Sequence, residues 1–174
     1  SASRMFVTDG AGKLVKEGTV TSHFTTNFPG GRFPVGSNGY YTPVTFSSLT
    51  ATITGTGAIL VRAVPTRQPN VPYFNNALIK YFDVESSNMS GITASMSFSF
   101  NSAEVIGSVA LYSPRVWNGT ALVPVTSPSA PGSNPFSTTG TTFITGQWTA
   151  MDPTVRTSLY SYQSGDWADP NTWT

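Results

Sequence analysis

The segment from Ile92 to Phe100, ITASMSFSF, alternates apolar and hydroxyl residues at every position. Successive side chains of a β-strand point to opposite faces, so this period of two predicts a strand with one apolar face and one hydroxyl face. Strands of this kind are typical of antiparallel sheets that cover a core on one side and meet water on the other. The segment therefore requires a second layer to cover its apolar face.

Short segments of the same character recur along the chain. The 16 glycines and 13 prolines are spread through the sequence instead of gathering in one linker. No segment shows a helical period over ten residues. We therefore predict an all-β protein, an antiparallel β-sandwich of about nine or ten strands with an extended C-terminal tail. The predicted strands include residues 18–26, 40–54 with a break near Ser47 or Ser48, 58–64, 78–84, 92–100 and 141–149.

Two local patterns make the predicted fold more specific. Asn118-Gly119 lies between the segments 108–117 and 121–125, and it suits the tight type I′ turn of a β-hairpin. The inward phase of the clearest strands predicts a core shared by two sheets. We expect that core to contain Val61, Phe98, Phe100, Leu111 and Phe143.

The charge composition excludes several classes of partner. Only 10% of the residues are charged, the net charge is +1, and the nine Lys and Arg residues are scattered. A nucleic acid or an anionic membrane surface would require a basic stripe, so we expect neither partner. No apolar run is long enough to cross a bilayer, and we expect no membrane insertion. The absence of cysteine excludes disulfides and thiolate-bound metals.

The sequence offers little catalytic chemistry. His23 is the only histidine, so a histidine metal cluster is excluded and a Ser-His-Asp triad would have to use this residue. Its surroundings indicate an ordinary strand position. The sequence has no Gly-x-Ser-x-Gly elbow, phosphate-binding glycine loop or Cys-x-x-Cys pair. We therefore predict no catalytic residue, no metal site and no cofactor, in a protein that is not an enzyme.

Two groups of carboxylates leave alternatives open. Asp83 and Glu85 are two residues apart and would share a strand face, where a carboxylate pair could serve glycoside hydrolysis. The favoured interpretation places them in solvent at a strand end, beside Lys80. Asp166 and Asp169 could supply oxygen ligands for calcium, although no Asp-x-Asp-x-Asp run is present. Turn initiation at Asp-Pro is the simpler interpretation of this second group.

Three aromatic residues are the candidate ligand-binding side chains: Tyr40, Tyr73 and Trp117. All three lie near predicted loops, where exposed rings could stack on sugar faces. Neighbouring aromatic residues on a strand point to opposite faces, so one member of each of the pairs Tyr40-Tyr41 and Tyr73-Phe74 should belong to the core. A tryptophan beside a hairpin turn often packs across the strand pair. Both facts weigh against a sugar platform.

Several motifs follow one another in a fixed order over nearly the whole chain. They are Thr-Asp-Gly-x-Gly-x-Leu at 8–14, Phe-Pro-Val-Gly at 33–36, Tyr-x-Pro-Val at 41–44, AILVRAVPTRQPN at 58–70, KYFDVESS at 80–87, ITASMSFSF at 92–100, LYSPRVWNGTALVPV at 111–125 and FITGQWTAMDP at 143–153. By these motifs the chain resembles a β-sandwich module that recurs in very large, multidomain surface proteins of Bacteroidetes. The long segment 127–139 departs from that pattern.

The resemblance implies how the chain is organised and where it acts. In those proteins the module is followed by Ser-Gly-x-Trp-x-x-Pro-x-Thr-Trp, which matches SGDWADPNTW at 164–173. It implies a β-sandwich module over residues 1–160, and a linker or the start of the next module over 161–174. Trp167 and Trp173 would then be covered by that neighbour. It also implies export by the type IX secretion route, an extracellular, cell-surface location and no catalytic residues.

We therefore expect a noncatalytic structural or adhesive module of a secreted or cell-surface multidomain protein, acting as a rigid spacer or a binding module. Its partners would be the neighbouring modules of the same polypeptide, and glycans or another surface protein. The alternative is a carbohydrate-binding module attached to a polysaccharide-degrading enzyme. A hydrolase that uses Asp83 and Glu85 is the third hypothesis.

Overall fold

The computed structural model describes residues 5–26, 31–72, 76–126 and 129–154. The predictions for the tail 161–174 and for Tyr73 lie outside these residues. Strands dominate the described part of the chain, as predicted, together with one short α-helix and two 3-10 turns. The elements in chain order are β1 (Phe6–Val7), β2 (Leu14–Gly18), α1 (Ser22–Thr25), β3 (Arg32–Phe33), β4 (Val35–Ser37), β5 (Tyr40–Tyr41), β6 (Val44–Val64), β7 (Tyr81–Phe98), η2 (Ser102–Glu104), η3 (Val109–Leu111), β8 (Ser113–Trp117), β9 (Leu122–Pro124), β10 (Phe136–Thr141) and β11 (Gly146–Met151).

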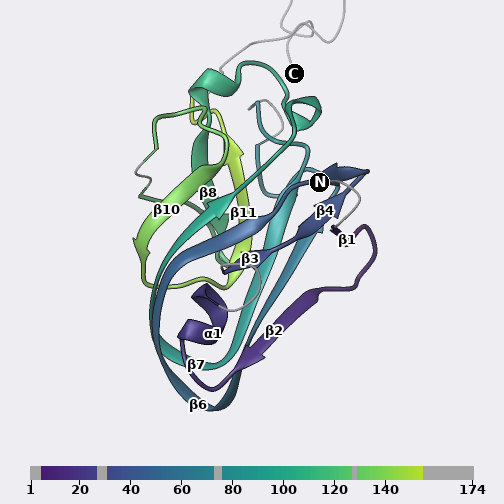
Figure 1. The fold of residues 1–174 in the computed structure, drawn as a ribbon. Coiled ribbons are helices and arrows are strands. Elements are labelled where there is room, and N and C mark those ends of the chain that lie inside the picture. The colour runs from purple at the N-terminus through teal and green to yellow at the C-terminus, as the bar shows by residue number, and fades with distance from the viewer. Residues whose placement is uncertain (1–4, 27–30, 73–75, 127–128, 155–174) are drawn as a thin grey trace, which may run out of the picture.

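One long hairpin organises the fold. Strands β6 and β7 are antiparallel partners along nearly their whole length, and Figure 1 shows them turning together at the lower end of the molecule. The pairing register shifts between Ile53 and Ala58, which marks this bend. Gly55 has a φ of 69° there, a backbone conformation that glycine adopts without steric cost. Because of the bend, each of the two strands contributes to two layers.

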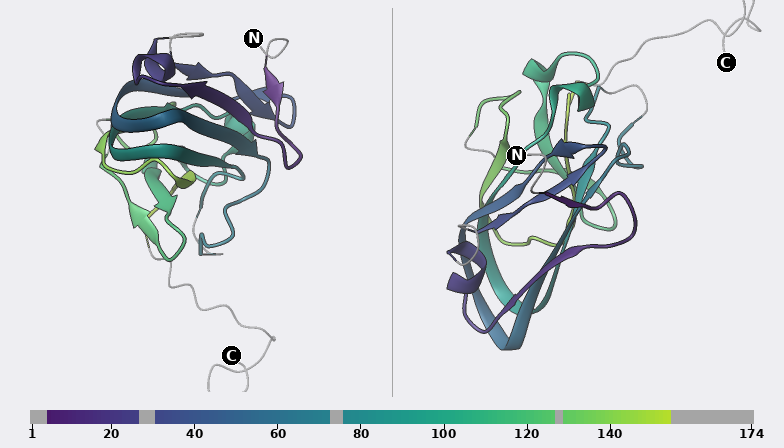
Figure 2. Two further views of the ribbon diagram at one scale, coloured as in Figure 1. Left: turned by 90° about the horizontal axis from the view of Figure 1, so that it is seen from below. Right: turned by 45° about the vertical axis from the view of Figure 1, so that its right-hand side comes forward.

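The bend folds the sheet over itself. The first layer contains β3, the first half of β6, the second half of β7, and β10. The second layer contains β2, the second half of β6, the first half of β7, and then β11, β8 and β9. Both layers rise from the bend in the right-hand view of Figure 2. All of these strand pairs are antiparallel, so the predicted antiparallel β-sandwich is confirmed.

An aromatic cluster fills the space between the layers. Phe98 in the first layer is fully buried and stacks on Trp148 in the second, with ring centroids 5.3 Å apart. Phe82 and Phe136 pack on the same Phe98 ring at 5.3 and 4.9 Å. Aromatic pairs at such separations add to the stabilisation that comes from buried area. The cluster therefore holds the two layers together at the end of the sandwich away from the bend.

The alternating segment behaves as its pattern predicts. Its buried residues are Ala94, Met96, Phe98 and Phe100, and the serines between them are partly exposed. Val61 is fully buried as well. The core predictions for Val61, Phe98 and Phe100 are therefore confirmed.

A small sheet, in the order β1-β4-β5, adjoins the sandwich (Figure 1). Thr8 connects it to β6, because the Thr8 hydroxyl donates to the carbonyl oxygen of Ala63 and accepts from the Ala63 N–H, both at 2.9 Å. At Gly36 an added Cβ would collide with the carbonyl oxygen of Tyr40. The last residue of the Phe-Pro-Val-Gly motif is therefore a glycine that permits close backbone approach.

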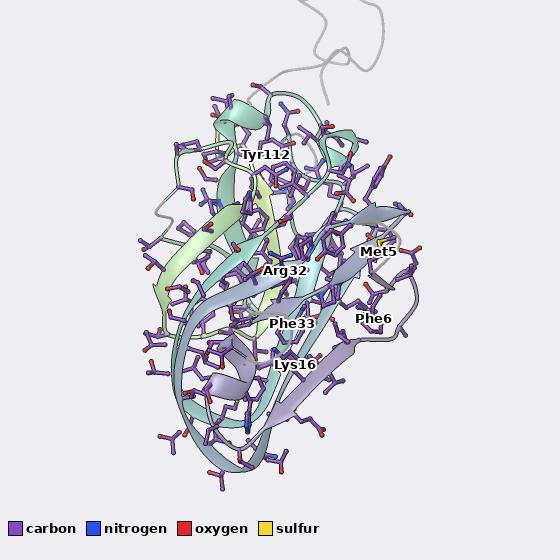
Figure 3. The ribbon with its side chains drawn as sticks, viewed as in Figure 1. Met5, Phe6, Lys16, Arg32, Phe33 and Tyr112 are labelled. Carbon is purple, nitrogen blue, oxygen red and sulfur yellow. The ribbon has the colours of Figure 1, made fainter. Side chains whose placement is uncertain are left out.

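The first residue of that motif, Phe33, anchors β3 in the core. Phe33 is fully buried, and its ring centroid lies 5.6 Å from that of Phe46. The Nζ atom of Lys16 lies 5.3 Å from the Phe33 centroid, and Figure 3 shows these two residues near each other. Burial lowers the pKa of Lys16. The cation thus covers the aromatic ring from β2.

The sequence predicts a strand over 18–26, and this prediction is wrong. Residues Ser22–Thr25 form α1, which buries Phe24 completely. The backbone N–H of Thr19 donates to Nδ1 of His23 at 3.1 Å, so the His23 side chain provides a hydrogen-bond acceptor for the backbone just before the helix. Phe24 is the one residue of this segment that points into the core. A strand with a single core residue would have no continuous apolar face to bury. His23 therefore lies in a one-turn helix instead of a strand.

Leu111 and Phe143 are also predicted wrongly, because they are 47% and 38% exposed. Leu111 belongs to η3, and this turn directs Tyr112 into the core in its place. The Tyr112 hydroxyl donates to the carbonyl oxygen of Ile106 at 2.6 Å and accepts from the Ile106 N–H at 3.0 Å. Phe143 lies where the chain crosses from β10 in the first layer to β11 in the second. The predicted strand 141–149 is therefore two strands.

The sequence underestimates the length of the two central strands. The predicted break near Ser47 or Ser48 is an irregularity between Phe46 and Ser48 inside β6, where the strand continues. Glycines and polar residues at the bend mimic the ends of strands. As a result, the segments 58–64 and most of 40–54 belong to β6, and most of 78–84 and 92–100 belongs to β7.

The predicted hairpin after residue 108 is confirmed in its pairing and wrong in its turn type. Trp117 on β8 pairs with Leu122 on β9. The N–H of Asn118 donates to the carbonyl oxygen of Ala121 at 3.2 Å, so four residues form the connection. Gly119 has a φ of 99°, whereas Asn118 does not share the positive φ that a type I′ turn requires.

Candidate functional site

The outer face of the second layer carries a row of polar side chains that ends at a tryptophan. Asp83 on β7 pairs with Gln147 on β11, and Gln147 pairs with Trp117 on β8. Arg62 on β6 pairs with Asp83 from the other side. Directly opposed residues of a sheet share a face. Their sequence neighbours Phe82, Val84, Val116 and Trp148 are fully buried, so the row faces outward.

An open groove of about 250 Å³ lies at the tryptophan end of this row. Gly146 belongs to its lining, and an added Cβ there would lie 2.8 Å from the carbonyl oxygen of Trp117. Glycine at this position therefore lets β11 pass close to the backbone of the partly buried Trp117. We refer to this site as the Trp117 groove; the side chains that line it are Asp83, Glu85, Trp117, Asn118, Thr145 and Gln147.

Two cations compensate the charges of the two carboxylates in the Trp117 groove. The Nζ atom of Lys13 forms ion pairs with Glu85 and, at 3.3 Å, with Oδ2 of Asp83. Nη2 of Arg62 lies 3.2 Å from the same Asp83 oxygen. The carboxylates are therefore partners of Lys13 and not neighbours of Lys80, as the sequence suggested. The Asp83 side chain is only 13% exposed, so its predicted place in open solvent is also wrong.

Two amide side chains present hydrogen-bond donors to the groove. Gln68, in the loop after β6, is fully buried, and its Nε2 donates to Oε1 of Gln147 at 3.0 Å. Oε1 of Gln147 therefore accepts this hydrogen bond, whereas Nε2 of Gln147 has no hydrogen-bond partner within the described residues. Oδ1 of Asn118 accepts three hydrogen bonds inside the hairpin turn, which leaves the Asn118 Nδ2 in the same situation. Each amide is thus oriented by the hydrogen bonds to its oxygen, and its nitrogen remains able to donate.

Lys80 occupies a different environment, inside the protein. It is fully buried, with Nζ 2.5 Å from Oε1 of Glu104 and 2.8 Å from Oγ1 of Thr42. Oε2 of Glu104 accepts from the N–H of Asn101 at 2.8 Å. Burial lowers the pKa of Lys80, while Glu104 acts in the opposite direction. Since Glu104 is only 2% exposed, the pair has a structural role and is out of reach of a ligand.

Two of the three aromatic candidates, Tyr40 and Trp117, lie in different sheets of the described structure. Tyr40 lies on β5 of the small sheet, whereas Trp117 lies on β8 of the large one. Both residues are partly exposed. Tyr73 lies outside the described residues. Trp117 instead meets Asp83 and Glu85, two residues that the sequence treated as a separate hypothesis.

Sequence reasoning missed Gln147, Gln68 and Lys13 as parts of this site. Gln147 precedes Trp148 in the sequence. If Trp148 is assigned to the core, the alternation of strand residues puts Gln147 on the outer face of the sheet, so the sequence could have predicted this orientation. Its partner across the groove depends on strand order, because β11 inserts between β7 and β8. Gln68 comes from a proline-rich loop with no period, and no local pattern indicates its contact with Gln147.

A second open groove, of about 220 Å³, lies between β9 and β10. Its described lining includes Val123, Val125, Thr141 and Phe143 and contains no charged or amide side chain. Pro124 on β9 cannot donate a hydrogen bond to an added strand, and β10 carries an irregularity between Thr138 and Thr141. These features protect the strand edges against the addition of another strand. Because the described lining also contains no charged or amide side chain, the second groove is the weaker candidate site.

Within the described residues, no group of three or more His, Asp or Glu side chains is arranged to hold a metal ion. No described helix is long and apolar enough to span a bilayer. The calcium hypothesis concerns Asp166 and Asp169, which lie outside the described residues. Searches against family models, curated proteins and solved structures find no match for this chain.

Proposed function

We propose that this protein is a noncatalytic structural or adhesive module of a secreted or cell-surface multidomain protein, and that it contacts its ligand through the Trp117 groove. The observation that carries the proposal is the groove itself, which combines an accessible aromatic ring with polar groups on rigid strands. Binding residues held by sheet strands need little ordering when a ligand arrives. The resemblance to Bacteroidetes surface modules supports type IX export, an extracellular location and neighbouring modules as further partners.

The noncatalytic part of the proposal is supported by what the carboxylates contact. The Oδ2 atom of Asp83 already receives two cations, and Glu85 shares one of them. A glycoside hydrolase needs one of its two carboxyl groups to act as a proton donor to the leaving group. Carboxylates tied to Lys13 and Arg62 are suited to orienting a ligand. The alternative, a carbohydrate-binding module beside a polysaccharide-degrading enzyme, would be favoured by a glycosidase domain in the same polypeptide.

The test is a surface-binding assay with the full chain fused to a fluorescent protein. Immobilised extracellular polysaccharides, fibronectin and collagen serve as the surfaces. We expect binding to at least one surface that is lost in Trp117→Ala and kept in Thr139→Ala, a control in the second groove. Turnover of a polysaccharide that disappears in Asp83→Asn would refute the noncatalytic assignment. Binding that Trp117→Ala leaves unchanged would remove the groove from the proposal.

A further inference from the structure

We infer that the Trp117 groove binds one uncharged sugar ring, with the apolar face of the ring on Trp117 and its hydroxyl edge toward Gln147 and Asp83. This inference rests on the proposed function, because it names the ligand class of the same groove. It differs from the platform of several aromatic rings that the sequence suggested. In the described structure a single ring supplies the apolar contact, and the strands beside it supply the polar ones.

The charge balance of the groove selects a neutral ligand. Asp83 and Glu85 contribute two negative charges, and Lys13 and Arg62 contribute two positive charges within ion-pair distance. An anionic ligand would meet the carboxylates, and a cationic ligand would compete with Lys13 and Arg62 for them. A charge that loses its partner on burial is costly. An uncharged ligand leaves all the ion pairs intact.

The groove offers both hydrogen-bond donors and hydrogen-bond acceptors, which neighbouring sugar hydroxyls require. Each sugar hydroxyl both donates and accepts, so adjacent hydroxyls are best met by donors and acceptors side by side. Nε2 of Gln147 and Nδ2 of Asn118 are donors that have no partner within the described residues. Oδ1 of Asp83 and Oε2 of Glu85 are acceptors, because the cations contact the other oxygen of each carboxylate.

The strand order places these groups beside the ring. Gln147 lies between Asp83 and Trp117 in the row across the sheet. A flat ligand that covers the Trp117 ring therefore meets the donor on Gln147 first and the acceptor on Asp83 next. Gln68 fixes this order, because its hydrogen bond to Oε1 keeps the amide nitrogen of Gln147 turned away from Gln68. Gln68 does not belong to the groove lining, so it is a positioning residue that acts through Gln147.

The size of the groove limits the ligand to a small ring. Its volume of about 250 Å³ lies below the range of roughly 300–1,000 Å³ that drug-sized ligands fill. One sugar ring fits such a space. The second groove is nearly as large but lacks amides and charges, so it cannot satisfy a hydroxyl edge in the same way.

The experiment is an NMR titration of the ¹⁵N-labelled full chain with cellohexaose, xylohexaose and mannohexaose. Hexagalacturonate and hexalysine serve as charged comparison probes. We expect at least one neutral hexasaccharide to shift the indole N–H signal of Trp117 and the side-chain amide signals of Gln147. Trp117→Phe should retain binding because it keeps an aromatic face. Gln147→Leu should weaken binding about tenfold, which corresponds to one lost hydrogen bond. Thr139→Ala is the matched control and should bind like the unchanged protein.

Several outcomes would overturn the inference. One is a complete lack of shifts at Trp117 and Gln147 with all three neutral hexasaccharides. Another is equal weakening by Thr139→Ala and Gln147→Leu, which would place the ligand elsewhere. Binding of hexagalacturonate or hexalysine alone, lost in Trp117→Ala, would refute the neutral sugar while the groove remained the contact site of the proposed module. The signal dispersion of each variant reports whether it is folded.

Discussion

The buried ion pair between Lys80 and Glu104 leads to a quantitative prediction about stability. Both residues are almost completely excluded from solvent, and Nζ lies 2.5 Å from Oε1. Removing one partner of such a pair leaves a buried charge without compensation, which costs about 3–5 kcal/mol. We therefore expect Glu104→Gln and Lys80→Met each to lower the free energy of unfolding by about that amount. Glu104→Gln retains an acceptor for the N–H of Asn101.

The double variant Lys80→Met/Glu104→Gln contains no buried charge at this site. We expect its loss of stability to be smaller than the sum of the two single losses by at least about 2 kcal/mol. The four proteins form a double-mutant cycle. The hydroxyl of Thr42 loses its partner in both variants that carry Lys80→Met, so this contribution cancels when the coupling energy is calculated. Urea unfolding at pH 7 measures all four proteins, and equal m-values confirm that the change is in stability.

The matched control is the ion pair between Lys13 and Glu85 at the surface. Its side chains are 19% and 47% exposed. Coupling across such a pair is typically below about 1 kcal/mol, because solvent screens the charges. A cycle of Lys13→Met and Glu85→Gln should therefore show little coupling. If the buried pair shows no more coupling than this surface pair, or if its single variants cost under about 1 kcal/mol, the reasoning from burial is wrong.

Three further predictions concern the core and the backbone. Phe98→Ala should cost about 3–5 kcal/mol in urea unfolding, because three aromatic rings surround Phe98, whereas Ser97→Ala on the outer face should cost below about 0.5 kcal/mol. Tyr112→Phe should cost about 1–2 kcal/mol at pH 7 because two hydrogen bonds are lost. Burial raises the pKa of Tyr112, so the stabilisation is complete below about pH 10 and is lost at higher pH, where unfolding curves of the two proteins should converge. Gly36→Ala should lower stability by about 1–3 kcal/mol through backbone collision, while Gly12→Ala, with open space around it, should change stability by less than about 0.5 kcal/mol.

The fold class was accessible from the sequence because the period of a strand is local. Ile92 to Phe100 displays it in nine consecutive residues, and the structure buries the phase that the pattern selects. The two core residues predicted wrongly, Leu111 and Phe143, lie where the backbone leaves strand geometry. A 3-10 turn changes the phase at Leu111, and a crossing between layers changes it at Phe143. Apolar character alone does not reveal such changes of direction.

The candidate site was only partly accessible for a different reason. Trp117 stood out as an aromatic residue beside a turn, and Asp83 and Glu85 as neighbouring carboxylates on one strand. Their meeting depends on β11, which returns from the C-terminal part of the chain and inserts between β7 and β8. Strand order is a property of the whole fold and leaves no trace in any one segment. Gln147 therefore acquires its place in the groove only when all three strands are paired.

The shared hairpin has a consequence for how the chain reaches its native state. Because β6 and β7 pass through both layers, their pairing on each side of the register shift at the bend determines which residues face the core in each layer. A slip by one residue in either half would turn the core-facing side chains of that layer outward. Pairing that starts near Val64 and Tyr81, which are close in sequence, closes a short loop before the distant pair Val44 and Phe98 can form. Pairing would then continue from the first-formed half through the bend, where the register shifts between Ile53 and Ala58, into the second half. Gly55 lies in this register shift with a φ of 69°, which strains any other residue, so its substitution should slow folding as well as weaken the native state.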